Sequence, residues 1–271
     1  MYRTLKLEAK GRVATVTLNR PEARNAMSTQ LMREMIACAG RIGAMREIDV
    51  VILRGAGRYF SAGRDLKDNK SWYGSEQTLD QQREMSSLGF RMARAWEEMP
   101  QITIAAIDGY AVGGGVALAA ALDWRVVSED AFLWLPEIAL GIPLTWGTLP
   151  RLVNLVGPAR AKRLAILCER IPAAQALSMG LVDYVAPPGK AVQTAGALAK
   201  QVLALPRSSV RMTKESIDAY ASIGAHAASH MAHDQVQLAA ASSEARAARA
   251  AFAARKTKAA SSARSPARRR R

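Results

Sequence analysis

Apolar residues follow two different spacings along the chain, and the change between them predicts a mixed α/β fold. β-branched residues nearly alternate over residues 12–18, which predicts a strand ending at Asn19-Arg20-Pro21. Apolar residues over 31–45 recur at steps of three and four, which predicts an amphipathic helix with Ser28 as its N-cap. The continuous apolar run over 50–53 predicts a buried parallel strand, so strand, helix and strand form one crossover unit.

The rest of the chain repeats these signals. The predicted elements are a helix over about 81–99 ending at Pro100, strands over 102–107, 123–127 and 131–135, a turn and helix from Pro136, a helix over 173–179 closed by Gly180, and helical sequence over 191–255 broken at Pro206. A polar, mobile segment is expected over 67–78.

These elements predict three parts. They are an α/β core over residues 1–195, a helical C-terminal module over 196–255, and a disordered basic tail over 256–271.

A glycine triplet joins a predicted strand to a predicted helix. The run over 107–118 contains Gly113, Gly114 and Gly115 between an apolar strand and an Ala- and Leu-rich segment. Without Cβ atoms, backbone N–H groups at a helix start approach a ligand closely, which predicts an anion or oxyanion site. By itself, the triplet is more typical of a tight turn that packs a helix closely on a strand, so the anion site needs support from elsewhere in the chain.

Charge is distributed unevenly. The formal net charge is +15, and from Arg255 onward the chain has eight basic residues and no acidic one. About half of the excess positive charge therefore lies in a tail that ends in four arginines. Such a tail is expected to be solvated and disordered, with weak binding to a polyanion as the alternative.

Other features limit the possible classes. The N-terminus lacks the apolar core of a secretion signal, and the longest apolar window, residues 111–122, is too short to span a bilayer. Cys38 and Cys168 are far apart, which predicts a reduced, cytoplasmic setting. His226, His230 and His233 favour a solvated helix face over a metal site. We expect no membrane association and no bound metal.

Several stretches, in their order and spacing, resemble motifs of the enoyl-CoA hydratase/isomerase, or crotonase, superfamily. The resemblance covers nearly all of the chain except the last fifteen residues. The main motifs are Asn19-Arg20-Pro21-Glu22-Ala23-Arg24-Asn25-Ala26-Met27-Ser28, Phe60-Ser61-Ala62-Gly63-Arg64-Asp65-Leu66, the run over 109–118, and Leu135-Pro136-Glu137-Ile138-Ala139-Leu140-Gly141.

The resemblance implies a crotonase-like spiral of ββα repeats and a helical C-terminal trimerisation module. It also implies acyl-CoA thioester substrates and a homotrimer or a dimer of trimers. Coenzyme A enters as part of the substrate, and no further cofactor is expected.

The implied chemistry stabilises a thioester enolate with two backbone N–H groups, which the resemblance assigns to Ala62 and Gly114. Hydratases with two carboxylates carry one glutamate two residues after the glycine triplet and another in the Pro-Glu turn. This chain has Ala117 and Glu137 at those positions. An alanine cannot activate water, whereas one carboxylate suffices to move a proton between two carbons.

The resemblance also implies a set of substrate contacts. Arg24 matches a basic position near phosphate, the 62–66 backbone is expected to hold adenine, and Trp146 faces the acyl group or packs in the core. The implied substrate-binding residues are Arg24, Ala26, Ala62, Gly63, Arg64, Asp65, Leu66, Gly113, Trp146, Phe252 and Lys256.

The expected function is therefore an acyl-CoA enzyme with Glu137 as its single acid/base. The reaction is double-bond isomerisation or a hydration that uses one carboxylate, with hydrolysis or decarboxylation of another acyl-CoA left open. A non-catalytic acyl-CoA-binding homologue and nucleic-acid binding through the basic tail are the alternatives. Nucleic acid is not the expected partner, because no RNA-recognition aromatic pattern accompanies the tail.

Overall fold

The computed structural model describes residues 2–68, 78–225, 229 and 232–262. Most of the polar segment predicted to be mobile over 67–78, and the end of the basic tail, lie outside these residues. Within them, no helix is long and apolar enough to cross a membrane.

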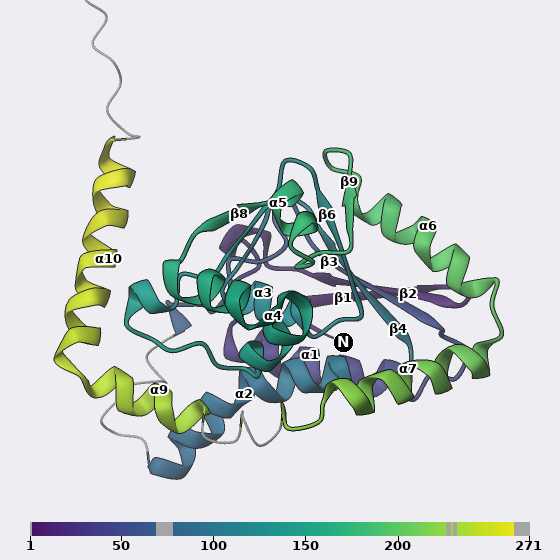
Figure 1. Cartoon of the computed structure of the whole chain (residues 1–271), viewed down its shortest axis with the longest axis horizontal. Helices are drawn as coiled ribbons and strands as arrows, with labels where there is room; N and C mark the ends of the chain where they lie inside the picture. Colours follow the sequence, from purple (N-terminus) through teal and green to yellow (C-terminus); the bar gives the residue numbers. More distant parts are fainter. Residues whose placement is uncertain (1, 69–77, 226–228, 230–231, 263–271) are drawn as a thin grey trace, which may run out of the picture.

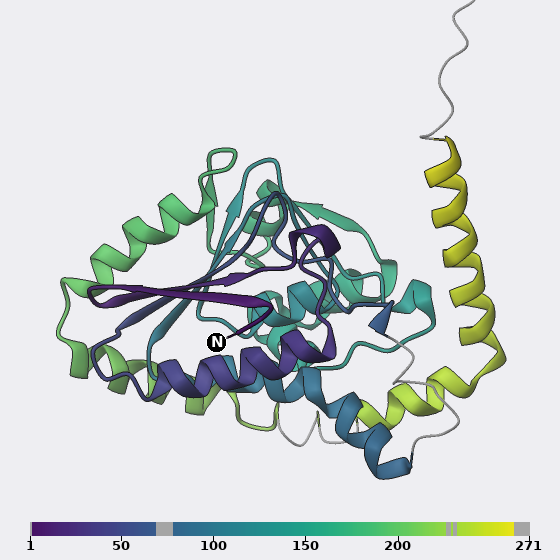
Figure 2. The same cartoon turned by 180° about the vertical axis from the view of Figure 1, so that it is seen from behind.

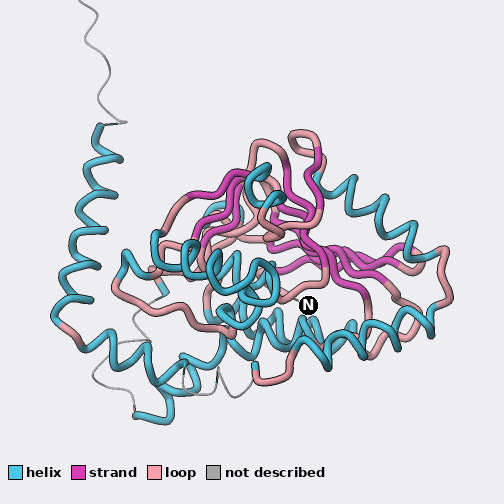
Figure 3. The backbone as a smooth tube through the Cα atoms, in the orientation of Figure 1, coloured by secondary structure: helices cyan, strands magenta, loops and turns pink. Residues whose placement is uncertain are grey.

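A six-stranded sheet forms the centre of the fold, with helices packed on both faces (Figures 1 and 3). Its first strand pairs antiparallel with the second, and every later pair is parallel. The order is β1 (Leu5–Lys10), β2 (Val13–Leu18), β3 (Val50–Gly55), β4 (Ile102–Ile107), β6 (Trp124–Ser128) and β9 (Tyr184–Ala186).

Alternate side chains of the sheet enter two apolar layers. In β3, Val51 and Leu53 join the larger layer, whereas Val50 and Ile52 face the smaller one. The smaller layer is covered by α6 (Ala191–Leu203), and the larger one contains the apolar faces of α1 (Thr29–Gly43) and α2 (Leu79–Glu97). Burial on both faces explains why the strand is a continuous apolar run.

Helices α1 and α2 both begin with a side-chain cap. Ser28 Oγ accepts a hydrogen bond from Leu31 N at 3.2 Å, which confirms the predicted N-cap. Thr78 and Gln81 form a capping box at the start of α2. Gly180 has a φ of +82°, a left-handed conformation common just after a helix, so it closes α5 (Ala173–Ser178) as predicted.

A second, three-stranded sheet stands beside the first. It consists of β5 (Tyr110–Val112), β7 (Phe132–Trp134) and β8 (Arg170–Pro172). β5 and β8 have no counterpart among the predicted strands, because three residues are too few for an alternating pattern. The sheet carries α3 (Gly114–Ala120) directly after β5 and η3 (Ile138–Leu140) after β7, with α4 (Thr148–Leu167) following.

The C-terminal helices run along the edge of the molecule (Figure 2). They are α7 (Arg207–Ala221), α9 (Ala232–Ala241) and α10 (Ser243–Ser262). Because α10 extends to Ser262, residues 256–262 are helical and not disordered as predicted. The predicted boundary between residues 195 and 196 falls inside α6, whose Leu198 and Val202 are buried against the sheet. All of α6 therefore packs with the α/β core.

Candidate active site

Three segments that are distant in sequence meet at the glycine turn. The loop after β3 pairs with β5, because Val112 N donates to Ser61 O at 3.0 Å. Gly113 N donates to Trp134 O at 2.8 Å and so fixes the turn to the end of β7. The chain after Trp134 then brings Pro136 and Glu137 to the same place.

The Glu137 carboxylate lies against the first glycine of the helix start. A Cβ at Gly113 would lie 2.5 Å from Glu137 Oε1, so no side chain fits there without moving the carboxylate. Gly113 also has a φ of +52°, a conformation that L-residues rarely adopt. Glycine at this position therefore lets the carboxylate approach the turn closely.

Glu137 is held in a poorly solvated setting. Although the residue is partly exposed, its Oε2 atom is buried and has no hydrogen-bond partner among the described residues. Burial raises the pKa of the carboxyl group from 4.5 to about 7. A carboxyl group with this pKa is suited to both accepting and returning a proton near neutral pH.

The predicted donor pair requires one correction. Gly114 begins α3, where first-turn N–H groups have no partner within the helix. Ala62 N, however, donates to Arg24 O at 3.0 Å, and Gly63 N donates to Ser61 Oγ at 3.1 Å. The assignment of an oxyanion donor to Ala62 therefore does not fit, because its N–H stabilises the loop.

The next peptide group has a different orientation. Gly63 O accepts from Met27 N at 2.7 Å, and the peptide bond to Arg64 is trans. Because N–H and C=O point in opposite directions in a trans peptide, the Arg64 N–H points away from Met27. A Cβ at Gly63 would lie 3.1 Å from Gly114 N, so this peptide group borders the glycine turn.

A buried polar network, which no sequence pattern indicated, shapes the same loop. The fully buried Asn25 donates through Nδ2 to Ala56 O at 2.9 Å and to Tyr59 O at 2.8 Å. Ser61 Oγ donates to Asn25 O at 2.8 Å. These bonds fasten the 56–63 loop to the turn before α1.

The predicted substrate-binding residues of this region include both exposed residues and buried residues that are bonded within the loop. Arg24 is exposed beside the Tyr110 hydroxyl, and Leu66 is also exposed. Asp65, by contrast, is buried and pairs with Arg20 at 2.8 Å, and Arg20 also donates to Ala26 O. Asp65 and Ala26 therefore stabilise the loop through Arg20.

The C-terminal residues do not join the site within the described chain. α10 contacts η3 near its own start, where Ala245 packs against Gly141. Phe252 is partly buried seven residues later, about 10 Å further along the helix. Lys256 lies in α10, and its side chain is outside the described part. Their predicted contact with CoA stays a prediction.

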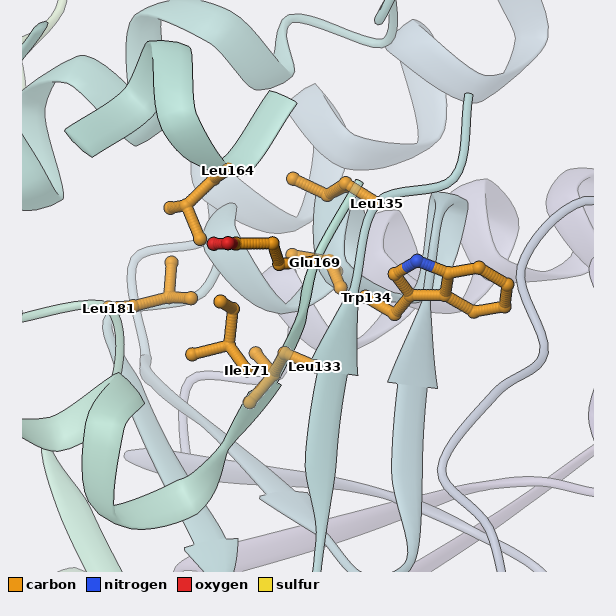
Figure 4. A pocket seen from close by; sticks show the side chains of 8 residues that line it. Leu133, Trp134, Leu135, Leu164, Glu169, Ile171 and Leu181 are labelled. Atoms are coloured by element: carbon orange, nitrogen blue, oxygen red, sulfur yellow. The ribbon is translucent and has the colours of Figure 1, made fainter. Parts of the chain in front are cut away.

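A small, mainly apolar pocket lies beside the second sheet. Its only charged lining residue is Glu169, which pairs with Arg163 at 2.7 Å (Figure 4). The pocket is lined by Val116, Leu133, Trp134, Leu135, Leu164, Glu169, Ile171 and Leu181. Because Glu137 and Gly114 are not among these residues, the pocket is separate from the candidate site.

Metal ligands do not cluster in the described chain. Among residues 2–68, 78–225, 229 and 232–262, no three His, Cys, Asp or Glu side chains are placed to hold a metal ion. His226 and His230 lie outside these residues, so their predicted solvated helix face stays a prediction.

The chain is similar to known proteins in both sequence and fold. A short-chain-enoyl-CoA hydratase of Clostridium acetobutylicum is 36% identical over 213 residues, covering 78% of this chain and 80% of that protein. A crotonyl-CoA hydratase of Syntrophomonas wolfei is 31% identical over 214 residues, covering 79% and 80%. A crystal structure of an enoyl-CoA hydratase from Mycobacterium avium subsp. paratuberculosis superposes with a TM-score of 0.83 at 27% identity, covering 94% of this chain and 97% of that one.

The family model described as enoyl-CoA hydratase/isomerase matches residues 8–260. The chain therefore belongs to the enoyl-CoA hydratase/isomerase family and has its crotonase fold, as predicted. The family acts on acyl-CoA thioesters.

The raised pKa of Glu137 predicts a pH-dependent cost to stability. Because the folded protein binds this proton more tightly than the unfolded chain, its stability falls as pH rises from 4.5 to about 7. Glu137→Gln removes this titration. The free energy of unfolding of the variant minus that of the wild type should therefore be about 2–3 kcal/mol larger at pH 8.5 than at pH 5. Urea unfolding at both pH values measures this difference.

The exposed Glu129 provides the control, and Glu129→Gln should show no comparable change. An equal effect of the two substitutions would contradict the assignment of a desolvated carboxyl group to Glu137.

Proposed function

We propose that this protein moves a proton on an enoyl-CoA thioester, with Glu137 as the single general acid/base. The observation that carries the proposal is the poorly solvated carboxylate beside Gly113 and Gly114. Its pKa of about 7 supports both the basic and the acidic role. No metal or further cofactor takes part in the proposed reaction.

The oxyanion in this proposal is held by the N–H groups of Gly114 and Arg64. Support comes from the place of Gly114 at the start of α3 and from the orientation of the Gly63–Arg64 peptide group. Each donor of this kind contributes about 3 kcal/mol of transition-state stabilisation. Arg64 replaces Ala62 in this role because the Ala62 N–H is bonded to Arg24.

Isomerisation is the favoured reaction. Glu137 takes a proton from C2 of a 3-enoyl-CoA, and the electron pair moves onto the thioester oxygen. As the enolate collapses, the protonated Glu137 returns the proton to C4, which gives the 2-enoyl-CoA. Ala117 supports this choice, because it is buried in the apolar layer where a second carboxylate would be needed to activate water.

Hydration with one carboxylate is the second candidate. It is favoured by the similarity to proteins named as hydratases. Incubation with 3-hexenoyl-CoA and with crotonyl-CoA, each followed separately, distinguishes the two reactions. Turnover of neither substrate would contradict the proposal.

Loss of the carboxylate should abolish catalysis. We expect Glu137→Gln to lower kcat at least 100-fold while acyl-CoA binding persists, because an amide accepts no proton. In the wild type, kcat/KM should rise with pH and reach a plateau above about 7, where Glu137 is ionised. Steady-state kinetics from pH 5.5 to 9 check both, with Glu129→Gln as the control.

The backbone donor at residue 64 can be tested with a matched pair. Arg64→Pro removes the N–H group, and we expect it to lower kcat by about 100-fold or more. Arg64→Ala removes the same side chain but keeps the N–H, so its kcat should stay within a few-fold of the wild type. If folded Arg64→Pro and Arg64→Ala have the same kcat, the Arg64 N–H is not an oxyanion donor.

We also propose that the protein forms a homotrimer or a dimer of trimers. Support comes from large apolar side chains exposed on and beyond α7, among them Met212, Ile217, Tyr220 and Ile223. Light scattering after size exclusion should give a mass of three or six chains of 29.2 kDa. A monomeric mass would contradict the proposal.

A further inference from the structure

Trp146 has an unusual backbone conformation beside the glycine turn. Its φ is +60°, and the residue is 6% exposed. A bulky residue in the left-handed region is strained, and it persists only where its surroundings hold it there. Specific contacts must therefore hold Trp146 in this conformation.

Two glycines from different helices make room for the indole ring. A Cβ at Gly89 in α2 would lie 1.9 Å from the ring, and a Cβ at Gly114 in α3 would lie 2.3 Å from it. The ring is therefore packed directly against the backbone of both helices. Any larger residue at either position would displace it.

An ion pair fixes the backbone of the same residue. Arg151 in α4 donates through Nη1 to Trp146 O at 2.7 Å. The Arg151 guanidinium also makes two hydrogen bonds to Glu97 at the end of α2, at 2.7 and 2.6 Å. This bidentate pair joins α2 to α4 and holds the strained carbonyl in place.

Glu137 and Trp146 thus border adjacent residues of one turn. The carboxylate lies against Gly113, and the indole lies against Gly114. An acyl group whose thioester oxygen is held by the Gly114 N–H has to lie next to the indole. Ala117, three residues after Gly114 in α3, is buried among apolar side chains.

We propose that Trp146, held by the Glu97–Arg151 pair, limits the length of the acyl chain and makes this protein selective for short-chain acyl-CoA thioesters. Trp146 is the specificity-determining residue, and Glu97 and Arg151 are positioning residues. The inference rests on the proposed function, because it takes Gly114 as the group that holds the thioester.

Binding of saturated acyl-CoAs tests this limit without turnover. Calorimetry with butyryl-CoA and decanoyl-CoA should show that the wild type binds butyryl-CoA at least tenfold more tightly. Trp146→Ala should reduce this ratio at least tenfold by improving decanoyl-CoA binding, because removal of the indole opens space. Trp124→Ala removes an indole that packs beside the smaller apolar layer and should leave the ratio unchanged.

The positioning pair has its own controls. Glu97→Gln and Arg151→Gln should shift the ratio in the same direction as Trp146→Ala, whereas Arg163→Gln, which breaks an exposed pair on the same helix, should not. If Trp146→Ala fails to fold, Trp146→Leu provides a second variant that removes less of the side chain.

The outcomes separate the two proposals. If folded Trp146 variants keep the wild-type ratio of butyryl-CoA to decanoyl-CoA affinity, the length limit is overturned. This includes the case in which both ligands lose affinity equally. A different outcome is that the wild type shows the expected affinity ratio but neither isomerises nor hydrates an enoyl-CoA. That result would contradict the proposed function and leave the length limit standing.

Discussion

The Glu137 carboxylate occupies the space that a Cβ at Gly113 would need, and the candidate site depends on this close approach. The approach places a poorly solvated carboxyl group beside backbone N–H groups at the start of α3. Low solvation raises its pKa and so weakens the folded state at neutral pH. The larger apolar layer, which contains Ala117, Leu133 and Leu135, stabilises the surrounding fold.

Around this contact, backbone geometry is held by buried polar bonds. Asn25 adopts a φ of +54°, and its side chain fastens the loop after β3. Trp146 adopts a φ of +60°, and its carbonyl oxygen accepts a hydrogen bond from Arg151. Left-handed backbone at non-glycine residues costs about 1 kcal/mol or more, so each needs compensating contacts. The site thus combines glycines, which allow close approach, with strained residues that other helices keep in place.

Much of the fold was predictable because long elements carry repeated signals. The apolar run of β3, the periodic helix α1 and its Ser28 cap all match the structure. β5, β8 and β9, each three residues long, have no predicted counterpart because so few positions show no periodicity. The boundary inside α6 was misplaced because its alanine-rich sequence resembles that of the helices that follow, and only packing assigns it to the sheet.

Sequence alone determined the family motifs, the α/β alternation, and the presence of Glu137 and Ala117 at informative positions. These features are local in the chain, or depend on residue type and spacing. Tertiary structure alone decided that the Ala62 N–H is bonded to Arg24, that burial leaves Glu137 poorly solvated, and that Gly89 and Gly114 admit the Trp146 ring. Each of these is a contact between segments far apart in sequence, and no local pattern specifies which backbone groups such contacts occupy.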